Sequence, residues 1–110
     1  MSRVSTIELI EQLREEESGY LEVLSEDSMS VELATYPNPE PKYPHTEDEL
    51  YYIISGSGMA RVGEETYRIE EGDVLFVEQG LEHDFFDIEA EITALTVFAG
   101  PSDPSVVRDR

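Results

Sequence analysis

Apolar residues recur along this chain at two different periods, and each period predicts a different kind of element. Near the N-terminus, Ile7, Ile10 and Leu13 fall at helical spacing, just after a capping-box pair formed by Ser5 and Glu8. This segment predicts one short helix that ends before the first glycine of the chain. We expect its apolar face to pack on the remainder of the fold or on a second subunit.

From Tyr20 onward apolar and polar residues alternate in short runs, which is the pattern of β-strands. Glycines separate most of these runs, and no helical pattern lies between them. Residues 36–44 contain four prolines, so this segment is expected to be a loop or sheet rim. Short strands joined by tight turns indicate an antiparallel sandwich or barrel. The predicted strands are residues 20–24, 28–36, 50–55, 59–62, 66–69, 74–77, 83–88 and 92–98.

The length of 110 residues fits one domain with one modest core. Within it we expect three parts. They are an N-terminal helix in residues 1–18, a barrel in residues 19–100 and a C-terminal tail in residues 101–110 with two prolines and little periodicity.

The net charge of the chain limits the classes of molecule that it is expected to bind. Aspartate and glutamate total 26, lysine and arginine only 7, and the formal net charge is −19. Nucleic acids and anionic membranes are disfavoured, because both require a basic surface. Lys42 is the only lysine, and an acidic, lysine-poor composition resembles that of proteins from salt-loving organisms, so we expect a halophilic protein.

Three patterns are missing from the sequence. It has no cysteine, so any metal must be held by nitrogen and oxygen ligands. It has neither a run of about 18 apolar residues nor the pattern of a signal peptide. We therefore expect a cytoplasmic protein.

The candidate chemistry lies with the only two histidines. His45 stands four residues before Glu49, and His83 begins a predicted strand after a tight turn. Residues at strand ends of a barrel can converge at its mouth. Two imidazoles and one carboxylate suit Fe(II), and also Mn, Zn, Ni or Cu. By spacing alone, both histidines could equally be surface or capping residues.

Glycines and acidic residues surround these three positions in two regular patterns. They read His45-x3-Glu49-x6-Gly56 and Gly72-x5-Glu78-x-Gly80-x2-His83-x3-Asp87. Over about residues 43–87, the chain thereby resembles the two sequence motifs of the cupin superfamily. The resemblance implies an all-β, cupin-like double-stranded β-helix, or jelly-roll barrel, with a divalent transition metal on His45, Glu49 and His83.

The chain departs from the cupin pattern at three positions. The family's first histidine falls on Tyr43, its usual proline on Glu78 and its usual asparagine on Asp87. Tyr43 bears directly on the site. It is a candidate fourth ligand, a hydrogen-bond donor to bound water, or a wall residue beside a three-ligand site, and the last of these is the interpretation we favour.

Other residues are assigned more loosely. Tyr51, Arg61, Phe76 and Phe85 are candidates to line a pocket, although for Arg61 a surface ion pair with a neighbouring glutamate is the interpretation we favour. Glu47 and Asp48 are rival carboxylates to Glu49, but the glycine register favours Glu49. Both rivals are expected to belong to the solvated acidic surface.

The resemblance implies several functions rather than one, because a fold hosts many chemistries. The first hypothesis is a metal-dependent oxygenase or isomerase acting on a small organic molecule. The second is a non-catalytic module that binds or senses a small metabolite, and the third is a metal-free structural protein. A homodimer is expected in each case.

Overall fold

A computed structural model describes residues 3–38 and 47–99. Its one helix, α1 (Thr6–Leu13), begins at the predicted cap, where the backbone N–H of Glu8 donates to Ser5 Oγ at 3.4 Å. The helix ends at Leu13, because the next residues include three consecutive glutamates and no apolar side chain that would extend the buried stripe. Among the described residues, no helix is long and apolar enough to cross a membrane.

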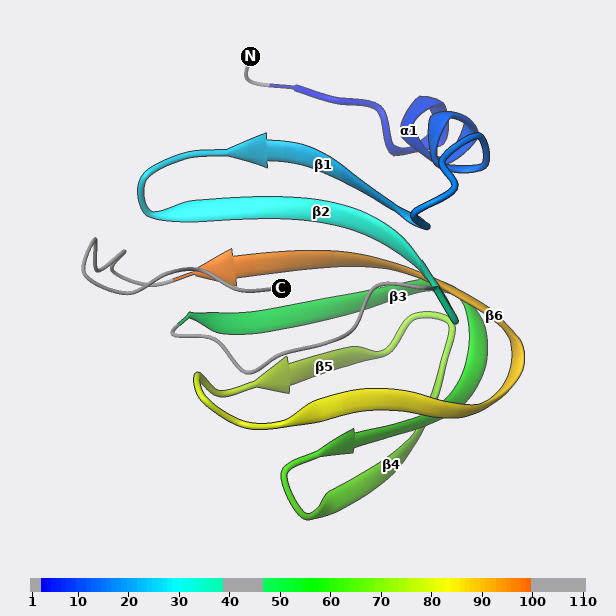
Figure 1. Ribbon diagram of the computed structural model, residues 1–110, viewed down its shortest axis with the longest axis vertical. Helices are drawn as coiled ribbons and strands as arrows, with labels where there is room; N and C mark the ends of the chain where they lie inside the picture. Colours follow the sequence, from blue (N-terminus) through cyan, green and yellow to red (C-terminus); the bar gives the residue numbers. More distant parts are fainter. Residues whose placement is uncertain (1–2, 39–46, 100–110) are drawn as a thin grey trace.

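All the strands are antiparallel and belong to one strongly curved sheet, which confirms the predicted all-β class (Figure 1). The sheet order is β1-β2-β6-β3-β4, and β5 pairs with β3 beside it. The helix α1 packs against β1 and β2. The strands are β1 (Tyr20–Ser25), β2 (Met29–Tyr36), β3 (Asp48–Val62), β4 (Glu65–Glu70), β5 (Val74–Val77) and β6 (His83–Ala99).

Strands β3 and β6 are each a single long strand where the sequence predicts two. Both bend, so that the first half of β3 pairs with β5 and its second half with β4 (Figure 1). Gly56, expected in a turn, instead lies inside β3 at a register shift, with φ +96°. A Cβ there would lie 2.1 Å from the carbonyl oxygen of Glu91, so glycine allows the close approach of β6 that the bend requires.

Alternate residues of the paired strands point to the same face, and one set forms the core. Tyr51 and Ile53 of β3 lie opposite Thr96 and Ala94 of β6, and all four side chains are buried. Val77 of β5 extends the same interior. The core is therefore the concave side of the curved sheet.

Strand β2 reverses the usual distribution of polar and apolar side chains. Ser30 and Glu32 point to the interior, where Glu32 lies opposite Thr96 and is only 8% exposed. Met29 and Val31 belong to the outer set, and Met29 is 45% exposed. The interior of this barrel is thus partly polar, while part of its outer face is apolar.

Candidate functional site

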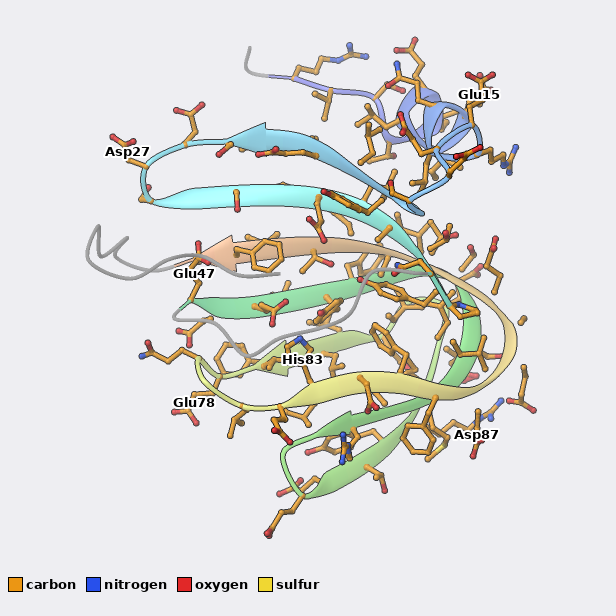
Figure 2. The ribbon with its side chains drawn as sticks, viewed as in Figure 1. Glu15, Asp27, Glu47, Glu78, His83 and Asp87 are labelled. Carbon is orange, nitrogen blue, oxygen red and sulfur yellow. The ribbon has the colours of Figure 1, made fainter. Side chains whose placement is uncertain are left out.

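Two of the three predicted metal ligands meet inside the barrel. Glu49 lies near the start of β3, and His83 is the first residue of β6. Glu49 Oε2 lies 2.9 Å from His83 Nε2, and the two side chains are 3% and 5% exposed. Figure 2 shows His83 within the interior, whereas the labelled Glu15, Asp27 and Asp87 lie at the periphery. The third predicted ligand, His45, and the nearby Tyr43 lie outside the described residues.

The other nitrogen of His83 has a backbone partner, because Nδ1 lies 3.0 Å from the carbonyl oxygen of Leu81. A carbonyl can only accept, so Nδ1 must carry a proton to make this bond. In a neutral imidazole this leaves Nε2 with its lone pair directed at the Glu49 carboxylate. At 2.9 Å the lone pairs of Nε2 and of the carboxylate oxygen repel each other, so a proton or a metal cation between the two atoms is needed to make the contact favourable.

Tyr51 holds the second oxygen of Glu49. Its hydroxyl donates to Glu49 Oε1 at 3.0 Å within the core. Burial, followed by the nearby Tyr36 phenol and Glu49 carboxylate, raises the pKa of Tyr51 well above its usual value. Tyr51 therefore stays protonated at neutral pH and acts as a donor that orients the carboxylate.

Aromatic rings pack beside Glu49 and His83. The ring of Phe85 lies 4.7 Å from that of Tyr36 and 5.2 Å from that of Tyr51, centroid to centroid. The Tyr51 ring lies 6.1 Å from the imidazole of His83. These contacts restrict the rotamers of Tyr51 and His83 and exclude water from one side of the site.

The interior carries an excess of acidic side chains. Glu32 and Glu47 are 8% and 6% exposed, and with Glu49 they place three carboxylates at buried positions. The strand-region arginines lie outside, where Arg61 pairs with Asp84 at 3.3 Å and Arg68 with Glu89 at 2.5 Å. Buried carboxylates favour a cation in their vicinity.

Within residues 3–38 and 47–99, no group of three or more His, Asp or Glu side chains is arranged to hold a metal ion. Glu49 and His83 form a two-residue set there. A complete site requires a donor from the segment 39–46, which contains His45, or from a bound molecule.

Several weaker expectations need correction. Phe76 is 56% exposed and Arg61 is paired on the surface, so neither lines the interior, while Tyr51 and Phe85 do. The register explains this, because Phe76 lies opposite the outward-facing Leu50. Glu47 was expected on the solvated surface but is buried.

The other rival carboxylate, Asp48, points away from the interior. Its Oδ1 accepts a 3.0 Å hydrogen bond from the backbone N–H of Gln79 in the turn before β6. Asp48 thus fixes the turn that leads to His83, which is a structural role rather than that of a ligand.

A search for sequence motifs does not identify two of the interior residues, Glu32 and Tyr36. Both lie on β2, at the same alternation as Ser30 and Ala34. The sequence signal that could identify them is a strand in which the alternating residues that include Ser30 and Glu32 end with an aromatic residue, Tyr36. It is ambiguous by itself, because a half-exposed strand normally directs its polar set outward.

Three comparisons place the chain among known proteins. It is 34% identical over 87 residues to the uncharacterised protein SCO3923 of Streptomyces coelicolor, covering 77% of this chain and 83% of that protein. The crystal structure of BH2720 from Bacillus halodurans superposes with a TM-score of 0.73 at 15% identity, covering 94% of this chain and 85% of that one.

The dimethylsulfoniopropionate (DMSP) lyase DddQ from Ruegeria pomeroyi superposes with a TM-score of 0.64 at 21% identity. The match covers 80% of this chain but only 48% of the lyase, so the chain spans about half the length of that enzyme. At these identities the two structures show the shared fold alone. The family model of the cupin domain matches residues 30–98, which contain every strand except β1, apart from the first residue of β2 and the last residue of β6. The chain therefore belongs to the cupin family.

Proposed function

We propose that this protein binds a divalent transition metal inside its barrel, with Glu49 and His83 as ligands and His45 as the third. The observation that carries the proposal is the buried 2.9 Å contact between Glu49 Oε2 and His83 Nε2. A carboxylate and an imidazole nitrogen that meet in the core, next to acidic neighbours, form an environment suited to a cation.

The surroundings of the two side chains fit this use. Metal-bound histidines usually donate their second ring N–H to a carbonyl or carboxylate, as His83 Nδ1 does to Leu81. Metal-bound carboxylates are usually hydrogen-bonded as well, as Glu49 is by Tyr51. With oxygen and nitrogen donors and no cysteine, the candidates are Fe, Mn, Zn, Ni and Cu. When bound, such a metal supplies Lewis acidity or, for Fe and Cu, redox chemistry.

The charge of the interior favours one class of organic ligand. Glu32 and Glu47 add two carboxylates to that of Glu49, and Arg61 and Arg68 are occupied on the surface. A carboxylate- or phosphate-bearing molecule would meet like charge without a cationic side chain among the described interior residues. We therefore propose a small neutral or cationic organic ligand.

Elemental analysis tests the metal proposal directly. Protein purified in high salt without chelator is expected to contain close to one equivalent of a transition metal. Chelated protein is expected to melt at a higher temperature once the preferred metal is restored, because binding to the folded state alone stabilises it. Protein with no stoichiometric metal, and an unchanged melting temperature with Fe, Mn, Ni, Cu and Zn, would contradict the proposal and favour a metal-free structural role.

Two functions are compatible with such a site. One is catalysis, as an oxygenase or isomerase of a small organic molecule, and the other is non-catalytic binding or sensing. Oxygen consumption and product analysis with the metal-loaded protein distinguish them, using sets of neutral, amine-bearing and carboxylate-bearing molecules on the same carbon skeleton. Turnover supports the enzyme, and a thermal shift without turnover supports the binding module. A preference for the carboxylate set would contradict the proposed ligand class.

A further inference from the structure

The interior face of the sheet carries polar side chains in two adjacent rows that run across the strands. In the register of β1, β2, β6 and β3, one row is Glu22, Glu32, Thr96 and Tyr51. The row beside it is Ser30, Phe98 and Glu49. Glu49 lies on β3, at the proposed metal site, whereas Ser30 and Glu32 lie two strands away on β2. The interior therefore has a second group of polar side chains, apart from the proposed metal ligands.

Glu32 occupies its interior position at a cost to stability. It is 8% exposed, and the exposed Glu22 stands directly opposite it on β1. Like charges at directly opposed positions destabilise a sheet, and burial of a carboxylate adds a desolvation cost. An apolar side chain at position 32 would avoid both costs. Proteins commonly retain a destabilising group where their function requires it, so Glu32 points to a role in binding.

The hydroxyl of Ser30 is a second and independent sign of a ligand. Ser30 is 0% exposed, and its Oγ has no hydrogen-bond partner within the part of the chain that the structure describes. Buried polar atoms are nearly always hydrogen-bonded, to protein, to water or to a ligand. Ser30 precedes Glu32 by two residues on β2, so the two side chains share a face, with about 6.8 Å between their backbone positions. A donor group bound between them would satisfy the hydroxyl.

Thr96 adds a third oxygen-bearing side chain to this group. It is 0% exposed and lies directly opposite Glu32 on β6, on the same face of the sheet. We call Ser30, Glu32 and Thr96 the β2–β6 polar cluster. One carboxylate and two hydroxyls offer hydrogen-bond acceptors from three side chains, and none of the three is basic.

We propose that the β2–β6 polar cluster binds the primary ammonium group of a small organic ligand whose other end faces the metal site. A primary ammonium carries three N–H donors and one positive charge. The donors match acceptors on three side chains, and the charge matches that of the Glu32 carboxylate. The proposal rests on the proposed function in one respect, because it takes the barrel interior as the ligand site.

The aromatic residues of the interior argue against a quaternary ammonium group. Such a group has no N–H to donate and is typically held between the faces of several aromatic rings. The rings of Tyr36, Tyr51 and Phe85 instead pack against one another, and Tyr51 lies beside His83. The β2–β6 polar cluster itself contains no aromatic ring, so it suits a hydrogen-bonded cation.

The register limits the length of the ligand. Two strand spacings and one same-face step separate Glu32 from Glu49, which is about 12 Å between backbone positions on a flat sheet. Both side chains extend into the interior of a curved sheet, so the ligand has less than this distance to span. A short amino alcohol, with its ammonium and hydroxyl at opposite ends of a few carbon atoms, fits these limits.

Calorimetric titration of the chelated full chain with three probes tests the proposal. The probes are an aminobutanol with its two polar groups at opposite ends, the N-trimethyl analogue of this molecule, and the corresponding butanediol. The primary amine is expected to bind at least tenfold more tightly than either of the other two. Because the metal has been removed, this result does not depend on the assignment of the metal ligands.

Two variants and a matched control assign the binding to the cluster. Glu32→Gln keeps the shape of the side chain and removes its charge, so it should weaken amine binding at least tenfold and leave butanediol binding unchanged. Ser30→Ala removes one acceptor and should weaken amine binding several-fold. Glu26→Gln makes the same change in net charge at an exposed position after β1, and should leave amine binding as in the wild type. Circular dichroism verifies that each variant is folded.

Two outcomes would overturn the proposal. One is an amine that binds the wild type no more tightly than the trimethyl analogue or the diol. The other is an amine affinity that is the same in folded Glu32→Gln as in the Glu26→Gln control. An amine preference that depends on Glu32, in a protein that takes up no metal, would support this proposal and contradict the proposed metal site, so the two can fail separately.

Discussion

Tyr51 donates a hydrogen bond to one oxygen of the Glu49 carboxylate whose other oxygen contacts His83. Tyr51 is therefore a positioning residue for the proposed metal site. Its replacement by phenylalanine keeps the buried ring and removes the hydroxyl that donates to Glu49, so Tyr51→Phe is expected to weaken metal affinity by about 10- to 100-fold. In the metal-free protein, it should also cost about 1–3 kcal/mol of stability, because a buried acceptor loses its partner.

The adjacent residue provides a control for Tyr51→Phe. Tyr52 lies on the opposite face of β3 and is 44% exposed, so Tyr52→Phe is expected to leave metal affinity unchanged. Calorimetric titration of both variants with the metal found in the wild type measures the difference. Equal affinities in the two variants would show that Tyr51 does not orient the carboxylate.

The bend in β3 predicts that substitution by alanine destabilises the fold much more at Gly56 than at Gly72. Gly56→Ala places a Cβ against the backbone of Glu91 at positive φ, and is expected to destabilise the fold by on the order of 3 kcal/mol. Gly72 also has a positive φ, of +91°, but a Cβ there meets nothing within 4 Å. Gly72→Ala should therefore cost only about 1 kcal/mol. Urea denaturation measures both, and similar losses would contradict the close approach of β3 and β6.

Because the Tyr36 phenol is buried, we expect the folded protein to lose stability at alkaline pH. Burial, and after it the negative charge of Glu49, raises the pKa of the folded Tyr36 phenol above its ordinary value near 10. The unfolded chain therefore loses this proton first, and the stabilising contribution, fully present below pH 10, declines as pH rises toward the folded pKa. Tyr36→Phe should reduce the slope of stability against pH above 10 by roughly 1.4 kcal/mol per pH unit.

Urea denaturation of metal-free wild type and Tyr36→Phe from pH 7 to 11.5 tests this prediction. The two proteins should show parallel pH profiles between pH 7 and 9, where the phenol is protonated in both the folded and the unfolded state. They should diverge above pH 10. Parallel profiles throughout would mean that Tyr36 ionises as easily in the folded protein as in the unfolded chain.

The net charge of −19 predicts that the monomer is stabilised by salt. Like charges repel over about 10 Å in 0.1 M salt but over only about 3 Å in 1 M salt. The melting temperature in NaCl should therefore rise between these concentrations. Replacing Glu15, Glu16 and Glu17, all exposed after α1, by glutamine should raise stability at 0.1 M and reduce the gain from salt. A melting temperature independent of salt in both proteins would remove the basis for expecting halophilic adaptation.

The strand class could be predicted from this sequence because alternation is a local property. All eight predicted strands fall on real ones: three nearly match β1, β2 and β4, one matches β5 at both ends, and the other four are parts of β3 and β6. The two long strands could not be predicted. Gly56 has the local signature of a turn, whereas its role depends on the approach of Glu91, which is 35 positions away and makes no local signal.

The site could be predicted in part for a similar reason. Glu49 and His83 stand in motifs whose spacing is visible in the sequence, and the structure brings them into contact. The sequence offers Phe76 as a pocket-lining candidate because alternation does not say which set of side chains faces inward. For the same reason, alternation does not identify Glu32 as an interior residue. Its buried position follows from the register of β2 with β6.

A metal titration of the chelated protein, repeated on two ligand variants, tests the central claim most directly. Glu49→Gln retains the shape of the side chain and removes its charge, and His83→Ala removes the imidazole. The wild type is predicted to bind one equivalent of its metal, and each variant is predicted to lose that stoichiometric binding while remaining folded. One equivalent bound with unchanged affinity by either variant would contradict the assignment of Glu49 and His83 as ligands.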